Sequence, residues 1–153
     1  MSGGEITIRV ATSGDRDCIV GFLRAMAEET EGKRLDVEVL RAGAREALKD
    51  PSRCVYYLAE VDGAVVGQTM VTTEWSDWRN GFFWWIQSVY VEPGSRRIGV
   101  YRSLHDHIRS LARGRGDVCG LRLYVHRDNV GAMETYDSLG MSVTEYRLCE
   151  ESW

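Results

Sequence analysis

The segment 89–100, which reads VYVEPGSRRIGV, constrains the fold more than any other part of the chain. Its apolar start is typical of a strand, a Pro-Gly pair ends that strand, and the residues after Gly99 follow helical spacing. The first turn of such a helix leaves N–H groups without partners and carries partial positive charge. Arg96, Arg97 and Arg102 would add full charges. The segment therefore predicts either an anion-binding strand-to-helix junction or a solvent-exposed turn with incidental arginines.

Hydrophobic periodicity on both sides of this segment predicts alternating strands and helices. Period-two and apolar patterns predict strands at 6–10, 54–61, 64–73, 82–91, 121–125 and 143–149. Helical spacing and N-cap residues predict helices after Thr12, after Asp36, beyond Gly99 and after Asn129. Residues 28–34 and 74–81 are expected to be connecting segments. The order βααβββαβαβ indicates one α/β domain (α+β mixed) over residues 1–153, with a mostly antiparallel sheet flanked by helices.

Composition excludes several classes of protein. Of the 153 residues, 44% are hydrophobic and 27% are charged, which is ordinary for a globular chain. The formal net charge of -4 argues against nucleic acid as a partner. No apolar run has membrane-spanning length and no signal-peptide core is seen, so we expect a cytoplasmic protein without a membrane partner. The four cysteines form no CxxC pair and His105 and His107 fall on different helix faces, so no metal is expected.

Two motifs in the second half of the chain resemble the acetyl-CoA-binding pattern of the GCN-five-related N-acetyltransferases (GNAT). The first family signature is Arg or Gln, two residues, Gly, one residue, then Gly or Ala. Arg96 and Gly99 match it, and Tyr101 occupies the last small position. The second motif is a helix-capping Asn followed by a small residue, a Tyr and a Gly at set spacing, here Asn129, Ala132, Tyr136 and Gly140. The predicted order of strands and helices also agrees with this family.

The resemblance implies the GNAT acyl-CoA N-acyltransferase fold and an acetyl-CoA-dependent N-acetyltransferase (EC 2.3.1 class) that works by direct attack in a ternary complex. It implies that the pantetheine arm of acetyl-CoA lies where two strands splay and that backbone amides hold the pyrophosphate. Asn129 would orient the arm, and Arg96 and Arg102 would contribute charge. The implied cofactor-binding residues are Val89, Tyr90, Val91, Arg96, Arg97, Ile98, Gly99, Val100, Tyr101, Arg102, Asn129 and Tyr136.

The resemblance also assigns catalytic roles. The hydroxyl of Tyr136 would protonate the departing CoA thiolate, and the alternative is a core aromatic on a helix face. Many relatives carry a Glu on the active strand to take the proton of the amine, and this chain has Gln87 there. Glutamine has no basic group. We therefore expect water held by Gln87 and Ser88, a carboxylate from Glu74 or Asp77, or an amine that arrives neutral. A noncatalytic acyl-CoA-binding or sensing domain is the alternative.

Four of the five tryptophans lie between residues 75 and 85, beside acidic side chains. Cation-π attraction and carboxylates suit a cationic small-molecule amine, such as a diamine, polyamine or amino acid. The pattern loosely resembles the spermidine/spermine acetyltransferase branch. The predicted substrate residues are Glu74, Trp75, Asp77, Trp78 and Trp85. One alternative is that the tryptophans fill the core or a dimer surface, and another is an open groove for a protein or peptide amine.

Two further expectations concern segments outside these motifs. Glu28, Glu29 and Glu31 fall in the predicted segment 28–34 and are secondary candidates for the acceptor site, with solvated loop charge as the alternative. Exposed aromatics and a C-terminal strand that ends near Trp153 are expected to pair two copies of the chain across a two-fold axis. The predicted partners are therefore an amine acceptor and a second subunit in a homodimer.

Overall fold

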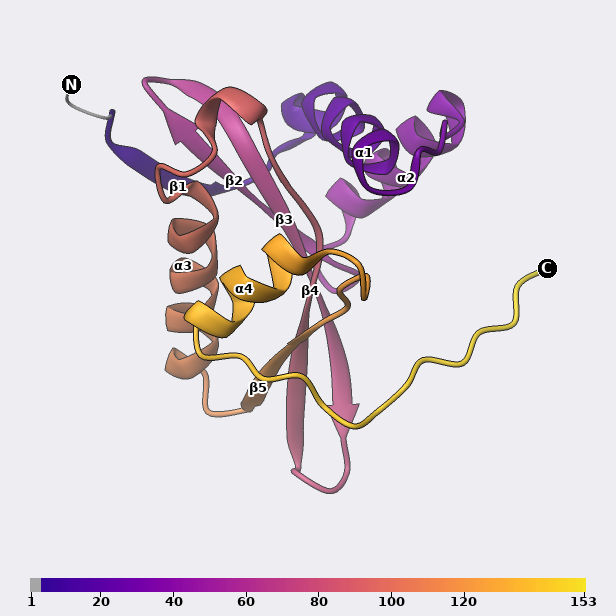
Figure 1. Cartoon of the computed structure of the whole chain (residues 1–153), viewed down its shortest axis with the longest axis vertical. Helices are drawn as coiled ribbons and strands as arrows, with labels where there is room; N and C mark the ends of the chain where they lie inside the picture. The colour runs from indigo at the N-terminus through magenta and orange to yellow at the C-terminus, as the bar shows by residue number, and fades with distance from the viewer. Residues whose placement is uncertain (1–3) are drawn as a thin grey trace.

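The structure, a computed structural model, describes residues 4–153 (Figure 1). Strands and helices alternate along these residues much as the periodicity predicts, and the mixed α/β class with a mostly antiparallel sheet is confirmed. The elements are β1 (Ile6–Val10), η1 (Ser13–Asp15), α1 (Arg16–Glu31), α2 (Val37–Lys49), β2 (Val55–Val61), β3 (Ala64–Ser76), β4 (Gly81–Val91), η2 (Pro93–Ser95), α3 (Val100–Gly114), β5 (Val118–Leu123) and α4 (Val130–Ser138).

The five strands form one sheet in the order β1-β2-β3-β4-β5, in which β1 to β4 pair antiparallel and β5 pairs parallel with β4. Asp62 and Gly63, with φ of 51° and 79°, make the tight turn predicted between β2 and β3. The pairing of β5 with β4 ends at Ile86, opposite Leu123. Residues 87–91 therefore continue β4 beyond β5, and this divergence makes a wedge between the two strands.

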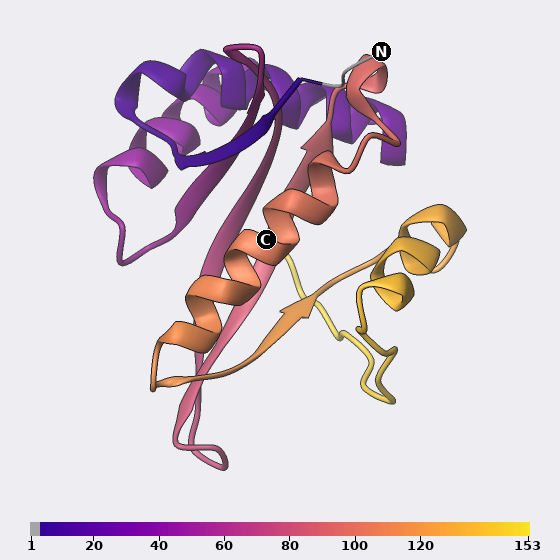
Figure 2. The same cartoon turned by 90° about the vertical axis from the view of Figure 1, so that its left-hand side faces the viewer.

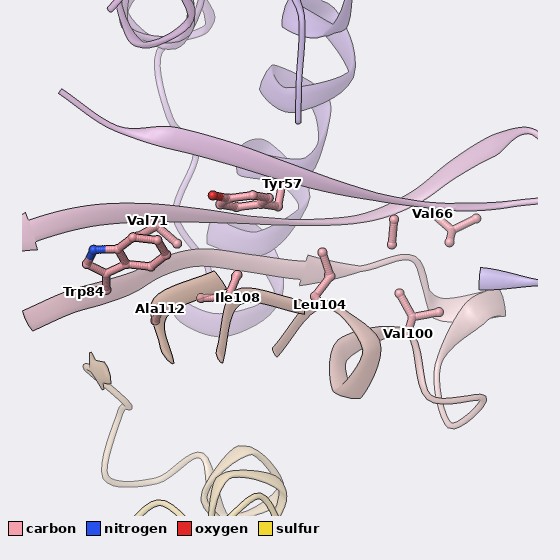
Figure 3. Close-up of a cluster of buried hydrophobic side chains, with 9 residues drawn as sticks. Tyr57, Val66, Val71, Trp84, Val100, Leu104, Ile108 and Ala112 are labelled. Carbon is pink, nitrogen blue, oxygen red and sulfur yellow. The ribbon is translucent and has the colours of Figure 1, made fainter. Parts of the chain in front are cut away.

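Helices cover both faces of the sheet. α3 packs on one face around a cluster of buried side chains drawn in Figure 3, which includes Tyr57, Val71, Trp84, Leu104 and Ile108. α1 and α2 pack on the opposite face over β2, around Ile19, Ala44 and Leu58 (Figure 2). Each fully buried Leu or Ile stabilises the fold by about 1.5–3 kcal/mol. The hairpin of β3 and β4 extends well past α1 and α2, so these helices leave its far end uncovered (Figure 1).

Two predicted connecting segments are partly wrong. α1 continues through Glu31 and ends at Gly32, whose φ of 61° closes the helix with hydrogen bonds from its own N–H to Glu28 and from the Lys33 N–H to Ala27. The charged residues 28–31 therefore belong to the exposed end of a helix. β3 runs on to Ser76, because Glu74 to Ser76 pair with Phe83 to Gly81 of β4. The polar composition of residues 74–76 predicted a loop, but their pairing with β4 makes them part of β3.

The strand predicted at 143–149 is wrong. Within the described chain, no strand follows Ser138, and the segment after Met141 is exposed and runs away from α4 (Figures 1 and 2). Val143 and Tyr146 have exposed fractions of 85% and 79%. A period-two pattern records a preference for a pleated, half-buried surface, but a strand forms only where a neighbouring edge takes its backbone hydrogen bonds.

Asp15 shows how a surface network stabilises the first strand-to-helix turn. Its carboxylate accepts from Arg9 at 2.8 Å and from the Thr12 N–H at 2.7 Å, and Arg9 also contacts Glu60 at 2.6 Å. The Arg9 hydrogen bond lowers the pKa of Asp15 to about 2.

We predict a pH-dependent cost for Asp15→Asn. A carboxyl with a lowered folded-state pKa contributes stability that is complete above about pH 4 and is lost as the pH falls toward 2. At neutral pH the variant should lose about 1 kcal/mol of unfolding free energy, a value reduced for solvent screening. Near pH 2 the two proteins should converge in urea titrations, and an equal gap at both pH values would contradict the assignment.

Candidate active site

The junction between β4 and α3 forms a cradle of backbone amides. Arg97 and Gly99 both take positive φ, 66° and 91°, which turns the chain sharply before α3 begins at Val100. Gly99 has no side chain with which to cap the helix, and the first intrahelical bond runs from the Ser103 N–H to Gly99 at 3.0 Å. The amides of Val100, Tyr101 and Arg102 therefore have no partner within the helix. This geometry suits a phosphate group.

Close packing fixes the cradle against the sheet. Val100 is 2% exposed and lies over Gly67 of β3. A Cβ at Gly67 would come within 3.0 Å of Val100 Cγ1 and 3.1 Å of the Tyr90 carbonyl oxygen, tighter than ordinary contact. The absence of a side chain at Gly67 thus allows the first turn of α3 to approach β3 and the end of β4.

The arginines of the cradle have different surroundings. Arg96 donates to the Val91 carbonyl at 2.8 Å and pairs with Glu29 at 2.7 Å, so it ties the end of β4 to the last turn of α1. Arg97 and Arg102 carry their charges at exposed positions beside the amides. Arg96 is therefore engaged by Val91 and Glu29, and all three arginines lie at exposed positions. Glu29, predicted as a secondary acceptor residue, is the partner of Arg96.

The wedge beside residues 87–91 exposes backbone groups. The Glu92 N–H donates to the Val66 carbonyl of β3 at 2.8 Å. Because successive strand residues direct their polar groups to opposite edges, those of Val89 and Val91 point away from β3, toward the wedge. The Tyr90 side chain is buried against Phe22 of α1, with ring centroids 5.2 Å apart. Of these predicted residues, Val89 presents its backbone to the wedge, the Val91 carbonyl accepts from Arg96, and Tyr90 contributes to the core.

A β-bulge interrupts β4 at the point where the wedge opens. Ser88 takes a φ of 52°, and the register with β3 shifts between Gln68 and Met70. Gln68 donates to the Ser88 carbonyl at 3.1 Å, and Thr69 donates to the Gln87 carbonyl at 3.2 Å. Bulges of this kind redirect side chains and are common beside active sites. The sequence predicted a regular strand here, and no residue type at 87–88 signals the bulge.

Gln87 is held by one of its two polar ends. Its Nε2 donates to Thr72 Oγ1 at 2.7 Å, which leaves Oε1 as an acceptor for a donor outside β3. Glu74 lies opposite Phe83 in the register, four residues from Gln87 along the strand, or about 13 Å. Gln87 therefore lies at the bulge, and Glu74 lies nearer to the turn that joins β3 and β4.

Tyr136 projects from α4 toward the first turn of α3. Asn129 caps α4 by accepting from the Ala132 N–H at 3.2 Å, as predicted. The ring of Tyr136 meets that of Tyr101 edge-on, with centroids 5.6 Å apart, which brings the two phenol side chains together. Burial raises the pKa of Tyr136, and the hydrogen bond from Tyr101 opposes this rise. The hydroxyl is therefore protonated at neutral pH, at a position next to the amide cradle.

The predicted acceptor residues divide between two faces of the hairpin. Glu74 and Trp85 lie on the face that α1 and α2 leave uncovered, where Trp85 stacks on Tyr124 with centroids 4.5 Å apart. Trp75 lies on the other face, edge-on to Phe82 at 5.0 Å. Asp77 and Trp78 occupy the hairpin end, and Trp78 is 92% exposed.

Arg122 lies on the same uncovered face as Glu74 and Trp85, and the sequence did not predict it as a site residue. Its guanidinium lies 3.6 Å from the centroid of the Phe83 ring and donates to Glu74 at 2.9 Å. The strand alternation of Leu121, Arg122 and Leu123 was the available signal, because it directs the arginine to the face opposite the partly buried leucines.

Metal-binding clusters and membrane-spanning helices are both absent from the described residues 4–153. No group of three His, Cys, Asp or Glu residues within them surrounds a potential metal position, and no helix in the same range is long and apolar enough to span a membrane. Burial raises the pKa of the Cys18 and Cys54 thiols, and all four cysteines are free.

Comparison with known proteins places the amide cradle, wedge and sheet in a class of acyl-group transferases. The model of the acetyltransferase (GNAT) family matches residues 19–141. A solved structure of a possible acetyltransferase from Clostridium difficile 630 is 42% identical, with a TM-score of 0.90 and 97% of each chain covered. No curated protein sequence matches the chain significantly.

Two more distant structures share the fold. A predicted acetyltransferase with acetyl-CoA from Clostridium acetobutylicum is 18% identical over 96% of each chain, with a TM-score of 0.78. Ribosomal-protein-alanine N-acetyltransferase from Brucella melitensis biovar Abortus 2308 is 17% identical, with a TM-score of 0.79 over 97% of this chain and 99% of that one. The chain belongs to the GNAT acetyltransferase family and is an acetyl-CoA-dependent N-acetyltransferase.

Proposed function

We propose that this enzyme transfers the acetyl group of acetyl-CoA to the primary amine of a cationic small molecule, such as a diamine, a polyamine or an amino acid. The observation that carries the proposal is the uncovered hairpin face, where Trp85 and Tyr124 lie next to Gln87 and Glu74 lies further along the same face. Aromatic faces and a carboxylate recognise an amine that carries additional positive charge. Arg122 beside Glu74 favours acceptors that also carry a carboxylate.

The cradle and wedge support a division of roles within the site. Acetyl-CoA supplies the thioester. The amides of residues 97–101 would hold its pyrophosphate, with Arg97 and Arg102 adding charge, and the backbone of Val89 would pair with the pantetheine arm. Asn129 would hold α4 beside that arm. The Tyr136 hydroxyl would give its proton to the leaving sulfur.

Gln87 would orient the amine by accepting one of its hydrogens on Oε1. This role needs the amine to arrive neutral or to lose its proton to water at the bulge, since Glu74 lies about 13 Å away along the strand. The cytoplasmic location stays a prediction from the sequence.

A protein or peptide amine is the second candidate acceptor. The observation that favours it is exposure, because Trp75 and Trp78 are 53% and 92% exposed and do not enclose a pocket in this chain. Rates measured with diamines, polyamines and amino acids against short peptides decide between the two. If every peptide tested is acetylated faster than every small amine, the small-molecule proposal is wrong.

Glu74→Gln tests the acceptor face. We expect kcat/KM for a diamine to fall about 10-fold, equivalent to about 1.4 kcal/mol, with acetyl-CoA affinity unchanged. The matched control is Glu38→Gln, which removes an exposed carboxylate paired with Arg41 on α2, far from the hairpin. An equal loss in both variants, or no loss in either, would place the acceptor elsewhere.

The C-terminal segment supports a homodimer. Val143, Tyr146, Leu148 and Trp153 are all more than half exposed. Exposed apolar residues of this density usually mark an interaction surface. β5 pairs with β4 on one side, and the sheet order ends at β5. We propose that residues 143–149 of one copy pair with this edge of a second copy.

Tyr146→Pro tests the dimer, because proline removes a backbone donor and disrupts strand pairing. We expect the wild-type protein to sediment as a dimer and the variant as a folded monomer. The exposed position of Tyr146 makes loss of the fold itself an unexpected result. A monomeric wild type, or a variant that sediments with it as a dimer, would contradict the proposal.

A further inference from the structure

His105 is a fully buried histidine with a partner at each ring nitrogen. It lies on α3 at 0% exposure, with Nδ1 3.2 Å from the Tyr101 hydroxyl and Nε2 3.0 Å from Arg109 Nη2. Arginine can only donate, so Nε2 must accept and cannot carry a hydrogen. Burial and the neighbouring charge of Arg109 lower the pKa of His105. The ring is therefore neutral with its hydrogen on Nδ1.

This tautomer fixes the direction of the next hydrogen bond. Nδ1–H donates to the Tyr101 oxygen, so the single hydrogen of Tyr101 must point elsewhere. The Tyr136 side chain lies edge-on to the Tyr101 ring, with centroids 5.6 Å apart, and its oxygen is the nearby acceptor for this hydrogen. Burial strongly raises the pKa of Tyr101, which keeps this hydrogen in place. The Tyr136 oxygen then accepts a hydrogen bond from Tyr101. The hydrogen of Tyr136 remains available for donation to a group other than these side chains.

Arg109 connects the same residues to the end of α4. It donates to the Leu139 carbonyl, at the C-terminal cap of the helix that carries Tyr136, and its other amino group lies 3.6 Å from Asp106. The side chain that sets the tautomer of His105 thus also holds α4 to α3. The remaining charged neighbour of His105 is Arg102, on the first turn of α3.

We propose that Arg109, His105 and Tyr101 form a directed hydrogen-bond chain that positions Tyr136 as a proton donor, with Tyr101 donating to the Tyr136 oxygen. These three are positioning residues, since they act through Tyr136. The inference rests on the proposed role of Tyr136 as the acid. It also explains why a tyrosine occupies the position where the family signature has a small residue, because the hydroxyl at that position completes the chain.

The position of the hydrogen on the His105 ring can be measured without an activity assay. In nitrogen-15 NMR spectra of the full-length protein, we expect the imidazole of His105 to show a protonated Nδ1 and an unprotonated Nε2 across neutral pH. The chain has three histidines, so His105→Gln assigns the signal by its loss. A hydrogen on Nε2, or a doubly protonated ring at pH 7, would overturn the proposal whatever role Tyr136 has.

Kinetics test the consequence for Tyr136. Tyr101→Phe and His105→Leu should each lower kcat about 10-fold, at the low end of what acid catalysis contributes, with acetyl-CoA affinity unchanged. Loss of the donor to Tyr136 should also move the alkaline fall of kcat to higher pH, because that bond lowers the pKa of Tyr136. His105→Gln has an amide that can both donate and accept, and it should stay within about 3-fold of wild type.

The outcomes separate this inference from the proposed function. If Tyr136→Phe lowers turnover but Tyr101→Phe and His105→Leu match wild type in rate and pH profile, the positioning chain is wrong and the role of Tyr136 stands. If His105→Gln is as slow as His105→Leu, directed hydrogen bonding is also rejected. If Tyr136→Phe itself keeps full turnover, the proposed acid is wrong, and the NMR result still decides the direction of the chain.

Discussion

Tyr136→Phe is expected to lower kcat about 100-fold while the Kd for acetyl-CoA stays the same, because the change removes one hydroxyl and nothing that binds. Tyr136 packs against Tyr101 through its ring, and phenylalanine keeps that edge-on contact. Without a donor, the thiolate must leave unprotonated or take a proton from water. Steady-state turnover and titration calorimetry with acetyl-CoA give the two quantities.

Tyr57→Phe is the matched control for this prediction. Tyr57 is 6% exposed on β2, on the face of the sheet that α3 covers, where its ring lies beside His107, so the control removes a core phenol hydroxyl. Its kcat should remain near that of the wild type. Equal kcat in Tyr136→Phe and the wild type would assign proton donation to another group.

Gly99→Val should weaken acetyl-CoA binding about 100-fold, the equivalent of losing one or two hydrogen bonds to a charged group. Gly99 has a φ of 91°, and a β-branched residue is disfavoured in that region. The backbone must therefore change at the start of α3, and the amides of Val100 and Tyr101 turn away from a common point. The dissociation constant of free CoA is the quantity to measure.

Gly63→Val controls for backbone strain. Gly63 has a φ of 79° in the turn between β2 and β3, away from the cradle. Both variants should lose thermal stability, and Gly63→Val should keep the wild-type affinity for CoA. Retained affinity in Gly99→Val would place the pyrophosphate at another site.

Local chemistry in the sequence was enough to predict most of the fold. The Asp62-Gly63 pair predicted the hairpin, Asp36 and Asn129 predicted helix starts, and all three are confirmed. In each case the residue stabilises its own turn through positive φ or by accepting a neighbouring N–H. The strand-to-helix junction at Gly99 is confirmed for the same reason.

Features that depend on distant partners were not predictable in this way. The strand expected at 143–149 does not pair with any strand of the described chain, and the extension of β3 to Ser76 needs the opposite strand. The bulge at Ser88 is held by Gln68 and Thr69, about twenty residues earlier. None of these contacts leaves a local pattern.

The positioning chain did leave a signal. Tyr101, His105 and Arg109 recur at intervals of four along α3, and residues four apart on a helix are neighbours on one face. The sequence prediction for His105 concerned only a metal site shared with His107, two residues away. Only the contact to Tyr136 on α4 requires the structure, because α3 and α4 are separated by a strand in the sequence.

The most direct test of acetyl transfer measures acetyl-CoA binding and free-CoA release in parallel, across diamines, polyamines, amino acids and short peptides. We predict binding without any acceptor and CoA release that depends on the acceptor and is fastest with a cationic small amine. Binding without acceptor-dependent release from any member of the panel would contradict the account and favour a noncatalytic acyl-CoA-binding domain.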